Sequence, residues 1–74
     1  MIKTGIYKHS KKGNLYRVHF IAKHTEILED MVVYEALYDN KMSKFWARPV
    51  SMFEDIVEIE GQKVPRFVYV GESI

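Results

Sequence analysis

The chain has 74 residues, a formal net charge of +1 and no cysteine, so it supports one domain with a small core and excludes disulfides and thiolate metal sites. Hydrophobic residues make up 47% of the chain and aromatic residues 14%, which excludes an intrinsically disordered protein. No segment reaches the ~20 consecutive apolar residues of a membrane helix, and Met1 to Gly5 lack the apolar run of a signal peptide.

These limits predict one domain over residues 1–74, with an ordered core from about residue 4 to about residue 70. The lack of cysteine favours a reducing compartment. We therefore expect a cytoplasmic protein that makes no contact with a membrane.

The N-terminal third predicts a β-hairpin. Residues 5–9 form a short extended segment, and Gly13 and Asn14 favour a turn after it. Residues 15–23 then alternate in the way of a strand with one buried face. We expect the even-numbered face of this strand to point into the core, that is, Tyr16, Val18, Phe20 and Ala22.

A polar connection and the strongest strand signal follow. Residues 25–30 predict one helical turn or a tight loop, with Thr25 as its cap. Residues 31–38 alternate with apolar side chains on both faces, which indicates a central strand that is covered twice or strongly curled.

The C-terminal third predicts a short strand, a helical turn and a hairpin. Residues 45–48 form a strand that Pro49 ends, because proline cannot donate a hydrogen bond to a sheet. Residues 50–55 predict one helical turn. Residues 56–60 alternate again and residues 64–70 form the last strand of the sheet. Gly61 between them supplies the positive φ of a type II′ hairpin turn.

Taken together, about six short strands predict an all-β fold. We expect a small antiparallel, partly closed barrel of the SH3-like kind, with one or two short helical turns. Closure would hide the edge strands, and this chain has little helix to cover them. An α+β fold, with one helix at residues 24–30 or 50–55, is the alternative.

The order of these landmarks resembles DUF1653, a small bacterial domain family of unknown function. The resemblance extends over roughly residues 5–69 and implies a single small bacterial domain without an assigned activity. The chain departs from the family pattern at Ala47, where the family tends to have a larger aliphatic residue, and in the variable turn at Ser10-Lys11. The matching segments are Gly5-Ile6-Tyr7-Lys8-His9, Lys12-Gly13-Asn14-Leu15-Tyr16-Arg17-Val18, Ala22-Lys23-His24-Thr25-Glu26, Glu29, Val32-Val33-Tyr34-Glu35-Ala36-Leu37-Tyr38, Trp46-Ala47-Arg48-Pro49, Met52-Phe53, Gly61 and Pro65-Arg66-Phe67.

A polar cluster between the two strongest strands is the first candidate site. His24, Thr25, Glu26 and Glu29 fall within six residues. On a helical turn Glu26 and Glu29 share a face. Two close carboxylates can act as an acid–base pair, whereas a nearby arginine turns them into a structural network.

Two arginines extend this candidate site. Arg48 precedes a proline, and Arg66 stands between a proline and a phenylalanine. A guanidinium fixed in this way suits recognition of a carboxylate or a phosphate. With Tyr34 and Trp46 as walls, the set predicts a non-catalytic binding module for a small anionic group or a peptide.

The distribution of charge supports an alternative function. Residues 1–23 carry six Lys/Arg and no acid, and residues 24–40 carry five acids and no Lys/Arg. Basic and acidic strands could pair across the sheet. A basic face on the N-terminal hairpin would instead bind nucleic acid, through Lys8, Lys11, Lys12, Arg17 and Lys23.

A small hydrolase-like enzyme is the third hypothesis, and an enzyme is the less favoured reading. The chain has no nucleophile elbow, no phosphate loop and no dinucleotide fingerprint. His19 and His24 have opposite parity, so they should face opposite sides of a strand. We therefore predict no metal site, no cofactor and no catalytic residue.

Overall fold

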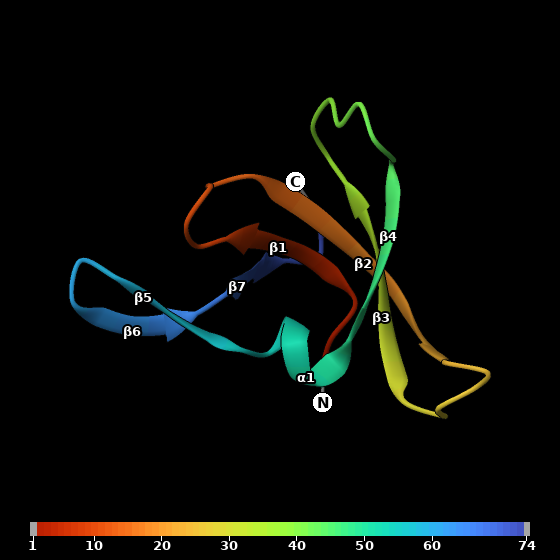
Figure 1. Ribbon diagram of the computed structural model, residues 1–74. Coiled ribbons are helices and arrows are strands. Elements are labelled where there is room, and N and C mark those ends of the chain that lie inside the picture. The colour runs from red at the N-terminus through yellow and green to blue at the C-terminus, as the bar shows by residue number, and fades with distance from the viewer. Residues whose placement is uncertain (1, 74) are drawn as a thin grey trace.

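The computed structural model describes residues 2–73 and contains two antiparallel sheets. The larger sheet has five strands in the order β4-β3-β2-β1-β7 (Figure 1). The smaller sheet is a hairpin of β5 and β6, and the four-residue helix α1 lies between β4 and β5. The elements are β1 (Gly5–His9), β2 (Leu15–Lys23), β3 (Asp30–Ala36), β4 (Phe45–Pro49), α1 (Val50–Phe53), β5 (Ile56–Ile59), β6 (Gln62–Pro65) and β7 (Phe67–Gly71).

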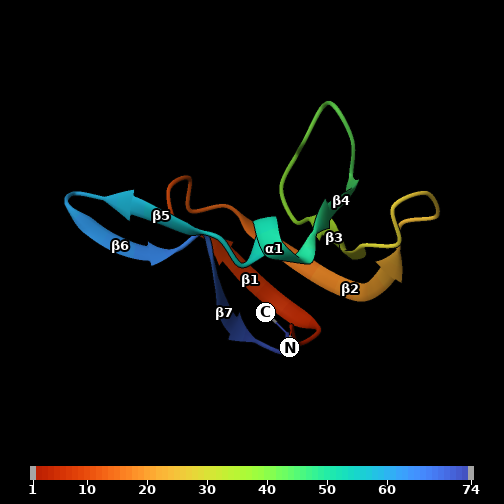
Figure 2. The ribbon, with the colours of Figure 1, turned by 60° about the horizontal axis from the view of Figure 1, so that its bottom comes forward.

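The all-β prediction is confirmed, whereas the predicted closure into a barrel is wrong. Within residues 2–73, β4 and β7 each pair with one neighbouring strand, so the five-stranded sheet stays open. The segment that could have closed it forms a separate hairpin instead, which extends away from the main sheet in both views (Figures 1 and 2).

The predicted last strand is two strands because the chain bends at Arg66. Pro65 ends β6 and cannot donate to a ladder. The Arg66 N–H donates to the Asp55 carbonyl at 2.8 Å, while the Arg66 carbonyl accepts from the Ser10 N–H at 2.8 Å. Arg66 therefore connects the small hairpin to the main sheet.

The turn of the small hairpin differs from the predicted type. Ile59 pairs with Gln62, so Glu60 and Gly61 are its two central residues. Glu60 has φ 51° and Gly61 has φ 81°. Positive φ at both positions is the signature of a type I′ turn, which matches the twist of the flanking strands.

A β-bulge changes the face that β2 presents to the core. Tyr16 and Val18 are buried as predicted. The register with β3 shifts between Val18 and Phe20, so one extra residue reverses the alternation. Phe20 is consequently 56% exposed, and its predicted inward position is wrong.

Stacked aromatic rings form the centre of the core. Helix α1 places Phe53 parallel to Phe67, with ring centroids 4.2 Å apart and an interplanar angle of 3°. The Phe53 ring also meets Tyr7 edge-on at 5.3 Å and Tyr34 at 5.5 Å. Phe53 thereby joins β1, β3 and β7 into one core, and the predicted helical turn at residues 50–55 is confirmed.

We expect Phe53→Ala to lower the free energy of unfolding by about 3–5 kcal/mol, because it removes a fully buried ring and leaves a cavity. Met52→Ala is the matched control from the same helix: Met52 is 53% exposed, so its change should stay within about 0.5 kcal/mol. Urea denaturation measures both. Equal losses in the two variants would contradict a core organised by Phe53.

Candidate functional site

A pocket of about 180 Å³ opens on the core side of β2, β3 and β4. Strands β2, β3 and β4 and the two loops beside them line it. We call it the tyrosine–arginine pocket. Its residues are Lys12, Tyr16, Tyr34, Tyr38, Asn40, Trp46 and Arg48.

The antiparallel register brings four of these residues to one face. Tyr34 lies opposite Trp46, and Arg48 lies opposite the buried Val32. Because side chains alternate along a strand, Trp46 and Arg48 point to the side that carries Tyr34. Tyr16 lies opposite Ala36 on the neighbouring strand and reaches the same face.

Three hydroxyl and amide groups in the pocket form a chain of hydrogen bonds. The Tyr16 and Tyr38 hydroxyl oxygens are 2.8 Å apart, and Asn40 Nδ2 donates to the Tyr38 hydroxyl at 3.0 Å. The Asn40 Oδ1 atom accepts from the backbone N–H groups of Met42 and Ser43, so the amide nitrogen faces the tyrosine. The hydrogen bond between Tyr16 and Tyr38 uses the hydrogen of only one of the two hydroxyls, so the hydrogen of the other hydroxyl can be donated to a ligand.

Tyr16 and Tyr34 stay protonated well above neutral pH. Burial raises the pKa of Tyr16, and the hydrogen bond with Tyr38 raises it further. Burial also raises the pKa of Tyr34, against the opposing effect of the nearby Arg48 guanidinium. These hydroxyls therefore act as hydrogen-bond donors and not as phenolate bases.

Positive charge surrounds the pocket. Arg48 lies over the Phe67 ring at 5.8 Å. Burial lowers the pKa of His9, and the cations Lys12, Arg66, Arg48 and Lys11 lower it further. The His9 Nδ1 atom accepts a hydrogen bond from the Lys12 N–H at 3.2 Å, as a neutral imidazole does.

The structure brings together three of the residues that the sequence predicted for an anionic ligand, namely Tyr34, Trp46 and Arg48. Arg66 makes an ion pair with Asp55 at 3.4 Å and is not among the residues that line the pocket. It contributes to the same positive region, since it lowers the pKa of the neighbouring His9.

The other four predicted residues form a separate turn between β2 and β3. The His24 Nδ1 atom accepts from the Glu26 and Ile27 N–H groups, at 3.2 and 3.3 Å, and Thr25 donates to Glu26. Among residues 2–73, neither Glu26 nor Glu29 makes an ion pair. The structure thus places this group outside the arginine site, in a tight turn that the Leu28 N–H closes by donating to the His24 carbonyl at 2.8 Å.

The basic residues predicted for nucleic acid are distributed over several surfaces. Lys12 lines the tyrosine–arginine pocket, and Arg17 lines a different depression together with Glu72. Lys23 pairs with Asp30 at 2.7 Å, Lys8 lines a third hollow, and Lys11 is exposed in the turn after β1. No single groove among residues 2–73 collects them.

Residues 2–73 contain no group of three or more His, Cys, Asp or Glu side chains placed to hold a metal ion. No helix within them has the length and apolar character needed to cross a membrane.

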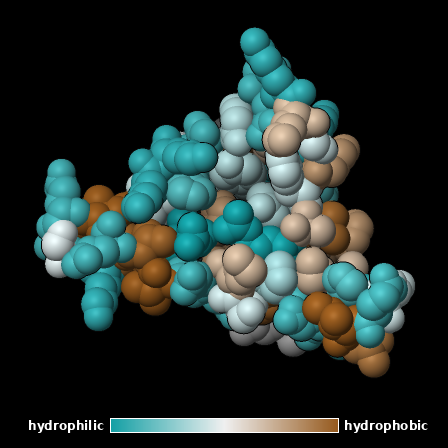
Figure 3. Space-filling model, in the orientation of Figure 1, coloured by the Kyte–Doolittle hydropathy of each residue, from teal (hydrophilic) through white to brown (hydrophobic). Residues whose placement is uncertain are grey.

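The surface shows where apolar side chains gather away from the pocket. Figure 3 shows brown areas at the left, over the β5–β6 hairpin, and at the lower right, over the β2–β3 turn. In that turn Ile27 and Leu28 are both largely exposed.

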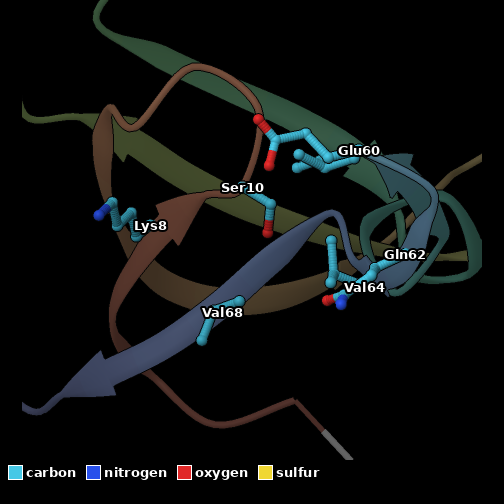
Figure 4. Close-up of a pocket in the computed structure, with 7 residues that line it drawn as sticks. Lys8, Ser10, Glu60, Gln62, Val64 and Val68 are labelled. Carbon is cyan, nitrogen blue, oxygen red and sulfur yellow. The ribbon is translucent and has the colours of Figure 1, made fainter.

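A larger hollow of about 460 Å³ lies between the β5–β6 hairpin and the β1–β7 pair (Figure 4). It combines an amine, a carboxylate and several apolar side chains, so its chemistry does not favour a ligand of one charge. Its lining residues are Lys8, Ser10, Ile59, Glu60, Gln62, Val64 and Val68.

The sequence did not single out Tyr16, Tyr38 or Asn40 for the anionic site, and it assigned Lys12 to nucleic acid instead. Tyr34 and Tyr38 share parity along one segment, which was a signal that they face the same side. Their meeting with Tyr16 depends on the pairing of β2 with β3, which no local pattern encodes.

Comparison with known proteins identifies relatives over almost the whole chain. Residues 5–69 match the family model DUF1653, described as a protein of unknown function. A crystal structure of a DUF1653 protein from Bordetella bronchiseptica is similar with a TM-score of 0.89 and 31% sequence identity. The match covers 96% of this chain and 90% of that chain. No curated protein matches this chain.

We expect the imidazole of His9 to titrate below its ordinary pKa of 6.5. The unfolded chain then takes up this proton at a higher pH than the folded protein does. The free energy of unfolding should therefore fall as the pH drops from about 6.5 through the folded pKa.

NMR titration of the His9 ring resonances measures this pKa directly. Arg48→Gln should raise it, because one of the nearby cations is removed, and Arg17→Gln is the control that should leave it unchanged. A His9 pKa at or above 6.5 in the wild-type protein would contradict the electropositive surroundings.

Proposed function

We propose that this chain, which belongs to the DUF1653 family, is a non-catalytic module. It binds a small anionic group in its tyrosine–arginine pocket. The ligand group is a carboxylate or a phosphate. The observation that carries the proposal is the chemistry of the lining, which offers hydrogen-bond donors and positive charge and contains no carboxylate.

The amide oxygen and the indole N–H of the lining already have partners within the chain. The Asn40 Oδ1 atom accepts from two backbone N–H groups, and the Trp46 Nε1–H donates to the Ser43 carbonyl. Arg48, Lys12 and one hydroxyl of the Tyr16–Tyr38 pair remain as donors. A ligand that only accepts hydrogen bonds and carries negative charge complements this set.

Aromatic walls also suit a cationic ligand, because an ammonium group is attracted to the faces of tyrosine and tryptophan rings. Arg48 and Lys12 both line this pocket, and a second cation there would meet like charge. The charge of the lining therefore favours an anion over an ammonium group.

The volume of the pocket limits the ligand to a small group. Pockets for drug-sized molecules measure roughly 300–1,000 Å³. The value here is about 180 Å³, which suits a terminal carboxylate or phosphate carried by a larger molecule. Such a group would lie within reach of Arg48, whose planar guanidinium can donate two parallel hydrogen bonds.

We expect inorganic phosphate or acetate, titrated at constant ionic strength, to shift the backbone amide NMR signals of the pocket residues in a saturable manner. Arg48→Gln should weaken this binding by about 10- to 100-fold, because a hydrogen bond to a charged group contributes about 1.5–3 kcal/mol. Tyr38→Phe, which removes one neutral donor, should weaken it by roughly 2- to 10-fold.

Arg17→Gln is the matched control, because it removes the same charge from a surface outside the pocket. It should leave the affinity within about twofold, since a single charge on another surface contributes little. Equal weakening by Arg48→Gln and Arg17→Gln would mean that the anions respond to net charge alone, and the proposed site would be abandoned.

A further inference from the structure

We propose that β4 pairs with β4 of a second copy of this chain, forming an antiparallel dimer about a two-fold axis at Ala47. The inference goes beyond the anion site and does not depend on it. β4 is the end strand of the five-stranded sheet, with β3 on one side and no strand on the other among residues 2–73 (Figure 1).

The register of β3 and β4 shows which backbone groups of β4 point outward. The Ala36 N–H donates to the Lys44 carbonyl at 2.8 Å, so residues 36 and 44 form a hydrogen-bonded pair. Hydrogen-bonded and non-hydrogen-bonded pairs alternate along an antiparallel ladder, and this one has no register shift. The N–H and C=O groups of Phe45 and Ala47, and the C=O group of Pro49, therefore point away from β3.

These outward groups are self-complementary. With Ala47 opposite the partner's Ala47, the two residues exchange both N–H···O=C hydrogen bonds. At each end the Phe45 N–H then faces the partner's Pro49 carbonyl, which is the N-cap carbonyl of α1 and shares its oxygen with the first hydrogen bond of that helix. Four inter-chain hydrogen bonds result.

One carbonyl of this edge has no donor on the partner strand, but it already has a hydrogen-bond partner within its own chain. Pro49 has no N–H to donate to the partner's Phe45 carbonyl. That carbonyl instead accepts from the Ser43 hydroxyl of its own chain at 2.8 Å. In the dimer, every outward N–H and C=O group of β4 therefore has a hydrogen-bond partner, and no backbone polar group of this edge is left unpaired.

The side chains of β4 fit the same arrangement. Phe45 is 56% exposed and Ala47 is exposed as well, so pairing removes apolar surface from water. On the other face, Trp46 lies opposite the partner's Arg48. An arginine beside a tryptophan ring is a favourable cation–π pair, and it would place a further cation at the edge of each tyrosine–arginine pocket.

The opposite edge of the sheet is less suited to such pairing. The register between β1 and β7 shifts between Ile6 and Tyr7. A bulge of this kind bends an edge strand and interrupts its regular ladder, which is a common way to prevent edge pairing. β4 pairs without interruption, so a second copy would meet a regular edge there.

A five-residue strand buries little surface, so we expect a reversible dimer in the micromolar range. Analytical ultracentrifugation of the full chain over a concentration series, up to about 1 mM, measures it. The wild-type protein should shift from monomer to dimer as the concentration rises. A wild-type protein that stays monomeric throughout, or that forms species larger than a dimer, would overturn the proposal.

Substitutions at the proposed axis test the register. Ala47→Lys and Ala47→Glu should each give monomers, because each variant places like charges directly opposite one another. An equimolar mixture of the two should restore a dimer, because the introduced ammonium group of one chain would then face the introduced carboxylate of the other. Circular dichroism checks that each exposed substitution leaves the fold intact.

Phe20→Lys is the control, because Phe20 has the same 56% exposure as Phe45 and lies on β2 in the interior of the sheet. It should dimerise like the wild type. A mixture that stays monomeric, or a loss of dimer in Phe20→Lys equal to that in Ala47→Lys, would exclude pairing about Ala47.

Discussion

The antiparallel register between β3 and β4 is the constraint on which the rest of the molecule depends. It places Trp46 opposite Tyr34 and Arg48 opposite Val32, so an aromatic ring and a guanidinium reach the core side of the sheet. The same register turns the polar backbone groups of Phe45, Ala47 and Pro49 outward. A shift of one residue would exchange the two faces, and both the pocket and the self-complementary edge would disappear.

The aromatic core and the tyrosine–arginine pocket share residues. Tyr34 packs edge-on against Phe53 and Phe67, and its hydroxyl end lies in the tyrosine–arginine pocket. Tyr16 likewise contacts Phe67 and shares a hydrogen bond with Tyr38. A 74-residue chain has few residues to spare for a site, so rings that bury their bodies and present their hydroxyls serve both purposes.

Although the formal net charge of the chain is only +1, positive charge is concentrated in one region of the fold. Four cations lie close enough to His9 to lower its pKa: Lys11 and Lys12 from the turn after β1, and Arg48 and Arg66 from distant parts of the sequence. Acidic residues balance the total elsewhere: Glu35 pairs with His19 and Lys44, and Asp30 pairs with Lys23. The protein thus combines a near-neutral overall charge with a pocket whose lining contains Lys12 and Arg48 and no carboxylate.

Local pattern was sufficient for the all-β class and for the helical turn that contains Phe53, because alternation and proline positions act over a few residues. It also selected Tyr34, Trp46 and Arg48, which the fold brings together around one pocket. The bulge that exposes Phe20, the separate β5–β6 hairpin and the meeting of Tyr16 with Tyr38 were decided by pairing between distant strands. The same pairing separated Glu26 and Glu29 from the arginines. Contacts of this kind depend on register, and register is set by the whole sheet rather than by any one segment.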